Sequence, residues 1–173
     1  QVASKPFQSS LFFMMSGFAS VSLAYGLYAL NNMMQKKAKD SLLGLGTFFV
    51  IFGLIGFTLA WSLDFSIVNA STQAEMEYSF SRQMGIYMPF GFINSFGWAI
   101  FLWAFSSKNF VNKLFNQILA LASAIVAILF IYTSLSIDRN DPNTIMPLFM
   151  GLALLQLLAT IWQLLVGRKM MKS

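Results

Sequence analysis

Five long apolar runs, separated by shorter polar links, make up most of this chain. A membrane-spanning helix needs about 20 consecutive apolar residues. Each run has that length, and none has Asp, Glu, Lys or Arg in its central part. The runs do not alternate with a period of two, as the strands of a membrane barrel do. We therefore predict an all-α membrane helix bundle, a single integral-membrane domain over residues 1–173. Its five transmembrane helices are expected near residues 9–31, 42–63, 85–106, 111–134 and 146–167.

The links carry residues that are typical of helix starts. Asp40 stands directly before the second run and is expected to cap it. Thr72 and Glu75 have the spacing of a capping box, which indicates that the third helix begins outside the bilayer, near residue 72. Pro147 fits the first turn of the fifth helix, where its missing N–H leaves no hydrogen bond unmade.

The basic residues are distributed unequally between the two sets of links. With five crossings, eight Lys and Arg side chains fall on one side and three on the other, whereas five of the six acids fall with the three. Short links rich in Lys and Arg stay on the cytoplasmic, matrix or stromal side of a membrane. The sequence therefore predicts that the N-terminus is outside and the C-terminus inside. The eight residues are Lys36, Lys37, Lys39, Lys108, Lys113, Arg168, Lys169 and Lys172.

Small residues recur at helical spacing in the first three runs. Small side chains at such steps let two helix backbones approach closely in lipid. This pattern fits packing within the protein, and it also fits the docking of another subunit on one helix face. The residues predicted to form these helix-packing faces are Gly46, Gly53, Gly56, Ser16, Ser20, Gly91 and Ser95.

Three amides lie well inside the apolar runs: Asn94 in the third run, and Gln156 and Gln163 seven residues apart in the fifth. Intramembrane polar side chains usually face the interior of a bundle or a water-filled cavity. They are expected either to form hydrogen bonds between helices or to line a polar path at the level of Asn94 and Gln156. The four Trp residues lie mostly near run ends, which favours interfacial belts.

The composition narrows the possible functions. The chain is 57% hydrophobic and 10% charged, whereas a soluble domain carries about 25% charged residues. It contains no His and no Cys, so the commonest general base and the usual soft metal ligands are missing. We expect no enzymatic activity, no bound cofactor or metal and no nucleic-acid partner. The net charge of +5 is divided among links between apolar runs, so it does not form a large basic surface.

These observations favour an accessory or scaffold subunit of a larger membrane complex, whose partners are membrane lipids and other integral-membrane subunits. A small-solute channel, transporter or transporter subunit with a polar path near Asn94 and Gln156 is the alternative. A membrane enzyme that acts on a lipid or a quinone is a third interpretation. The expected location is a plasma, inner or organelle membrane, which the chain crosses several times.

Overall fold

The computed structural model describes residues 6–37, 39–63, 66–67, 69–136 and 144–171. Within these ranges the fold is all-helical and contains no strand, as the sequence predicts. Five helices are long and apolar enough to cross a membrane. They are α1 (Pro6–Lys37), α2 (Ser41–Ser62), α4 (Gln73–Phe105), α5 (Lys113–Ser136) and α6 (Met146–Met170), and a short 3₁₀ helix, η1 (Ser106–Lys108), follows α4.

Local chemistry explains where the helices begin. The Asp40 carboxylate accepts a hydrogen bond from the Leu43 N–H at 3.1 Å and caps α2. Thr72 Oγ1 accepts from the Glu75 N–H at 3.2 Å, so α4 begins at residue 73. The predicted start near residue 85 marked only the apolar part, because the capped first turns of α4 are polar and exposed. Pro147 lies in the first turn of α6, as predicted.

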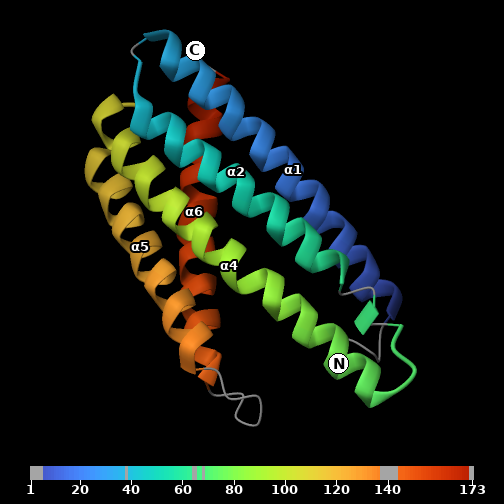
Figure 1. The fold of residues 1–173 in the computed structure, drawn as a ribbon. Coiled ribbons are helices and arrows are strands. Elements are labelled where there is room, and N and C mark those ends of the chain that lie inside the picture. The colour runs from blue at the N-terminus through green and yellow to red at the C-terminus, as the bar shows by residue number, and fades with distance from the viewer. Residues whose placement is uncertain (1–5, 38, 64–65, 68, 137–143, 172–173) are drawn as a thin grey trace.

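Helix α4 is central to the bundle, with α2 along one side and α5 along the other. Helix α1 packs mainly on α2, and α6 packs on α5 (Figure 1). Successive helices run in opposite directions, so α1 begins at one end of the bundle and α6 finishes at the other. The outer helices are the least enclosed, because only 11% of the most apolar window in each of α1 and α6 is buried.

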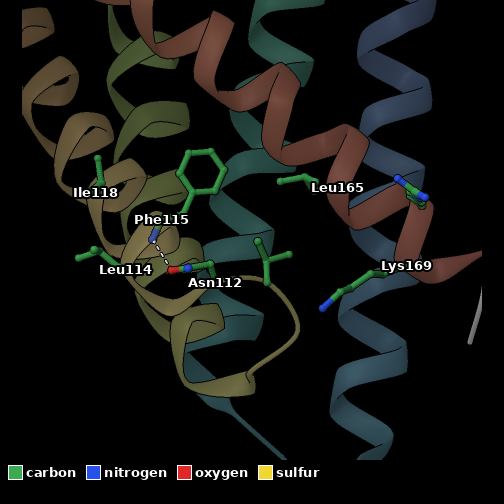
Figure 2. Close-up of a pocket in the computed structure, with 8 residues that line it drawn as sticks. Asn112, Leu114, Phe115, Ile118, Leu165 and Lys169 are labelled. Atoms are coloured by element: carbon green, nitrogen blue, oxygen red, sulfur yellow. Dashed lines mark hydrogen bonds between the residues drawn. The ribbon is translucent and has the colours of Figure 1, made fainter.

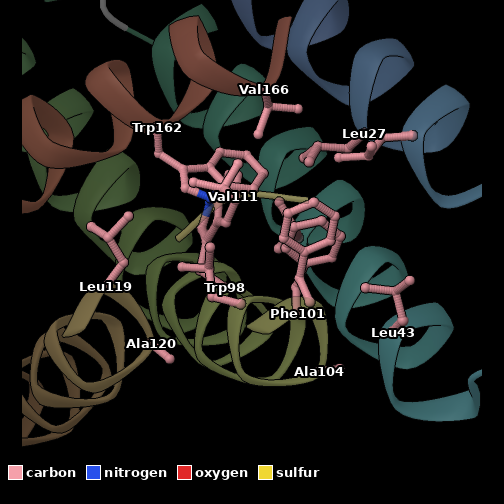
Figure 3. Close-up of a cluster of buried hydrophobic side chains, with 14 of the residues drawn as sticks. Leu27, Leu43, Trp98, Phe101, Ala104, Val111, Leu119, Ala120, Trp162 and Val166 are labelled. Atoms are coloured by element: carbon pink, nitrogen blue, oxygen red, sulfur yellow. The ribbon is translucent and has the colours of Figure 1, made fainter. Parts of the chain in front are cut away.

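An aromatic cluster occupies the core where α4 meets α6 (Figure 3). Trp162 of α6 packs edge-on against Trp98, Phe101 and Phe105 of α4, with ring centroids 5.5–5.8 Å apart. Such edge-to-face pairs are the favoured geometry of aromatic rings. The expectation of interfacial belts was wrong for Trp98 and Trp162, because both side chains point into the bundle and are buried. Trp103 remains exposed.

Candidate functional site

The predicted intramembrane amide Asn94 connects α4 to α2. Its Nδ2 donates a hydrogen bond to the backbone carbonyl of Val50 at 3.0 Å, and its side chain is buried. The two backbones are close at this point because α2 carries Gly53: a Cβ there would lie 2.7 Å from Asn94 Cα. The two helices are equally close two turns away on α2, at Gly46, where a Cβ would lie 2.5 Å from the Phe101 backbone nitrogen.

The structure places most of the other predicted packing residues inside this bundle as well. A Cβ on Gly56 would collide with the ring of Phe90, and one on Gly91 with the ring of Phe130 on α5. Ser20 and Ser95 are buried, whereas Ser16 is half-buried. Gly97 on α4, which the sequence analysis did not single out, also faces α2: a Cβ there would lie 2.6 Å from the Val50 nitrogen.

A small interior cavity brings together polar side chains from three helices. Asn94 and Ser95 of α4, Ser123 of α5 and Gln156 of α6 all line it, beside Trp162. Its volume is about 70 Å³, which corresponds to about two water molecules at about 30 Å³ each. Asn94 and Gln156 therefore line the same cavity, but most of its lining residues are apolar and its volume is well below the 300–1,000 Å³ that is usual for ligand sites.

Gln156 differs from the other interior amides in its surroundings. It lies near the middle of α6, and the residue is exposed although it also lines the cavity. Its side chain makes no hydrogen bond within the described part of the chain. Gln163, two turns further along α6, is half-buried and does not line this cavity. The neighbouring Thr160 hydroxyl donates to the Gln156 carbonyl at 2.8 Å and is satisfied within its own helix.

Asn116 is a structural residue that the sequence analysis missed. It is fully buried in the first turn of α5, and its Oδ1 accepts a hydrogen bond from Trp162 Nε1 at 2.7 Å. This bond holds α6 against α5. The only indication in the sequence is an amide at the start of an apolar run, and the adjacent Gln117 offers the same indication but is only half-buried.

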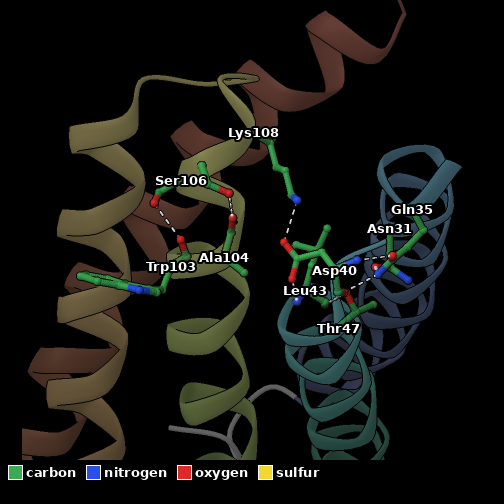
Figure 4. Close-up of polar contacts among 10 residues, drawn as sticks. Asn31, Gln35, Asp40, Leu43, Thr47, Trp103, Ala104, Ser106 and Lys108 are labelled. Atoms are coloured by element: carbon green, nitrogen blue, oxygen red, sulfur yellow. Dashed lines mark hydrogen bonds and ion pairs between the residues drawn. The ribbon is translucent and has the colours of Figure 1, made fainter. Parts of the chain in front are cut away.

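One end of the bundle holds a connected polar group at the start of α2 (Figure 4). The Asp40 carboxylate lies 2.6 Å from Lys108 Nζ, which joins the α1–α2 link to η1. The Gln35 side chain makes two hydrogen bonds to the Asp40 backbone: it donates to the carbonyl at 2.6 Å and accepts from the N–H at 2.8 Å. Partial burial raises the pKa of the Asp40 carboxyl, but hydrogen bonds from Lys108 and the Leu43 N–H outweigh this and leave the pKa below its usual value.

The same end carries an open groove of about 750 Å³ between the start of α5 and the last turns of α6 (Figure 2). Phe115 and Ile118 of α5 and Leu165 of α6 form its apolar part, and Arg168 and Lys169 lie at its outer end. Lys169 Nζ donates to the Phe110 carbonyl and lies 5.7 Å from the centre of the Phe110 ring.

Among the described residues, no group of three or more His, Cys, Asp or Glu side chains lies close enough together to hold a metal ion. Every buried side-chain nitrogen and oxygen in that part of the chain has a hydrogen-bond partner, which is what a helix bundle in lipid requires.

Comparisons with protein-family models, with curated proteins and with solved structures found no significant match to this chain. The class of protein is therefore defined by the fold alone: the described part of the chain forms a bundle of five helices, each long and apolar enough to cross a bilayer.

Proposed function

We propose that this chain is an accessory or scaffold subunit of a larger integral-membrane complex, with other membrane subunits bound on its outer helix faces. The observation that carries the proposal is the exposed amide of Gln156 in the middle of α6. On the same side of α6, one or two turns away, Phe149 and Ala153 are exposed and apolar, and the hydroxyl of the exposed Thr160 is satisfied within the helix. An amide transferred to an apolar medium without a hydrogen-bond partner costs several kcal/mol, so intramembrane amides rarely face lipid alone. A polar group of a partner helix would satisfy it.

The proposal includes an orientation with the N-terminus outside and the C-terminus inside. It is supported by the gathering of cationic side chains from separate links at one end of the bundle. Asp40, the one acid in these links, pairs there with Lys108. At the opposite end α4 begins with Glu75 and Glu77. The absence of His and Cys from the sequence supports a role without acid–base or redox chemistry of its own.

The experiment is purification in mild detergent from the native membrane, with two single-residue variants of α6. The native chain is expected to purify with partners in fixed stoichiometry. Gln156→Met keeps the shape of the side chain but removes its hydrogen-bonding atoms, and it should weaken association about 3- to 30-fold, from roughly 0.6–2 kcal/mol for an interhelical hydrogen bond. Thr160→Val is the matched control, because its hydroxyl is already satisfied within α6. A native chain that purifies without partners would contradict the proposal. So would a Gln156→Met variant that retains its partners in the same amount as the native chain.

A second function, a channel or transporter for a small solute, is favoured by one separate observation: the amides of Asn94 and Gln156 line the same cavity. That volume corresponds to only about two water molecules, so a larger solute would require α6 to move away from α4. The purified chain in liposomes tests this proposal by solute flux. Flux that is lost in Gln156→Met and retained in Thr160→Val would favour transport, whereas absence of flux in the native chain would exclude it for the solutes tested.

A further inference from the structure

The groove between α5 and α6 is basic at one end and apolar along the rest, which matches the charged headgroup and apolar chains of an anionic phospholipid. Its outer end carries Arg168 and Lys169 in the last turn of α6, and its inner part is formed by Phe115, Ile118 and Leu165. Lys113, the first residue of α5, stands beside the same outer end and borders the adjoining hollow. Because these cations lie at helix ends, they are level with the surface of a membrane that the helices span. The apolar side chains then lie deeper, where acyl chains run.

The size and shape of the groove also fit a bound molecule. Its volume of about 750 Å³ is within the 300–1,000 Å³ of typical ligand sites. In Figure 2, Phe115 from α5 and Leu165 from α6 point into the space between the two helices. Leu114 and Ile118, which also line the groove, are exposed. Two helices that pack directly along their whole length would leave no such space.

The charge of the groove favours an anionic occupant. Asp40 is the one acid in the links at this end of the bundle, and it is already paired with Lys108. No carboxylate lies within ion-pair distance of Lys113, Arg168 or Lys169 among the described residues. Lys169 does use one of its three N–H donors on the Phe110 carbonyl, which fixes the position of its ammonium group at the groove. Arg168 is exposed and presents a planar set of donors suited to a phosphate.

We propose that this groove binds one anionic phospholipid of the leaflet at the basic end of the bundle. Its phosphate would contact Arg168 and Lys169, and one acyl chain would lie along Phe115, Ile118 and Leu165. Basic pockets between transmembrane helices on the inner side bind anionic lipid headgroups by the same combination of forces. The proposal rests on insertion of the helices in a membrane and is independent of whether a partner subunit binds α6.

Native mass spectrometry of the full chain in mild detergent tests the proposal directly. The delipidated protein is given an equimolar mixture of phosphatidylglycerol and phosphatidylcholine with identical acyl chains. The native chain is expected to retain one phosphatidylglycerol in at least fivefold excess over phosphatidylcholine. The double variant Arg168→Gln/Lys169→Gln should lose this preference, because each cation removed should lower the affinity for phosphatidylglycerol about fivefold.

Matched variants separate the groove from general surface charge. Lys36→Gln/Lys39→Gln removes the same charge from exposed positions at the same end of the bundle that do not line the groove, and should leave the preference unchanged within twofold. Ile118→Asn changes no charge but makes the apolar wall polar at a half-exposed position, and should reduce lipid retention at least threefold. Lys169→Arg preserves the charge and should preserve binding.

Three results would overturn the proposal. Equal retention of the two lipids by the native chain would mean that the groove has no headgroup selectivity. An equal loss of preference in both double variants would assign the effect to overall charge. Displacement of the bound lipid by millimolar glycerol 3-phosphate would show that the site binds a phosphate alone and that the apolar groove contributes nothing. A change in partner stoichiometry, by contrast, would bear only on the subunit role.

Discussion

The contact between α2 and α4 at Gly53 can be tested with a single methyl group. In Gly53→Ala the new Cβ would lie 2.7 Å from Asn94 Cα and 2.8 Å from Asn94 N. These are backbone atoms, which cannot turn aside as the end of a flexible side chain can. Carbon atoms pack at about 3.5–4.0 Å, so the two helices must separate by about 1 Å.

The energetic cost follows from this separation. Overpacking of a tight contact costs about 1–3 kcal/mol. The Asn94–Val50 hydrogen bond, now 3.0 Å long, would lengthen to about 4 Å and be lost, and such interhelical bonds contribute about 0.6 kcal/mol. Against this, Ala is favoured over Gly inside a helix by about 0.5–1 kcal/mol. We therefore expect Gly53→Ala to lower the free energy of unfolding by about 1–3 kcal/mol.

Gly26→Ala is the matched control, since it is also a helical Gly→Ala change but has no atom within 4 Å of the new Cβ. It should be neutral or stabilising by up to about 1 kcal/mol. The assay is unfolding by SDS in mixed micelles, followed by far-UV circular dichroism. Equal free energies of unfolding for the two variants would refute the close approach of α2 and α4. In an Asn94→Ala background the cost of Gly53→Ala should fall by about 0.6 kcal/mol, because the hydrogen bond is already absent.

Three further predictions concern other parts of the fold. Trp162→Phe should lower the free energy of unfolding by about 1–3 kcal/mol in the same assay, because it leaves the buried Asn116 oxygen without its hydrogen-bond donor. Adding Asn116→Leu to this variant should restore part of the lost stability. If the costs of the two substitutions are simply additive, the Trp162–Asn116 hydrogen bond is contradicted. Asp40→Ala should cost about 1 kcal/mol more than Asp40→Asn, since Asn retains the N-cap. The advantage of native Asp40 over Asp40→Asn should be present above about pH 4 and disappear as the pH falls through its lowered pKa in an unfolding titration. A Cys at Lys39 should be protected from a membrane-impermeant maleimide applied outside and one at Glu77 labelled, and the reverse pattern would invert the proposed orientation.

The sequence was sufficient for the features that depend on neighbouring residues. The lengths and charge-free centres of the apolar runs predicted five helices. The caps at Asp40 and Thr72 act over three residues, and Pro147 lies in the first turn of α6. Such features need no knowledge of the rest of the fold, because a backbone in lipid has few alternatives to a helix. The spacing of Gly46 and Gly53 likewise indicated where backbones approach, although it did not distinguish an internal neighbour from another subunit.

Only the tertiary structure decided which helix faces meet, and with which partners. In water the apolar face of a helix identifies its buried side, but in lipid the outer face is as apolar as the core, so the sequence pattern does not separate them. Trp162 was therefore indistinguishable from an interfacial Trp until its contact with Asn116, 46 residues away, was known. The shared cavity of Asn94 and Gln156 and the groove beside Phe115 likewise arise from helices that are distant in sequence, because packing between helices determines where space and polar groups remain.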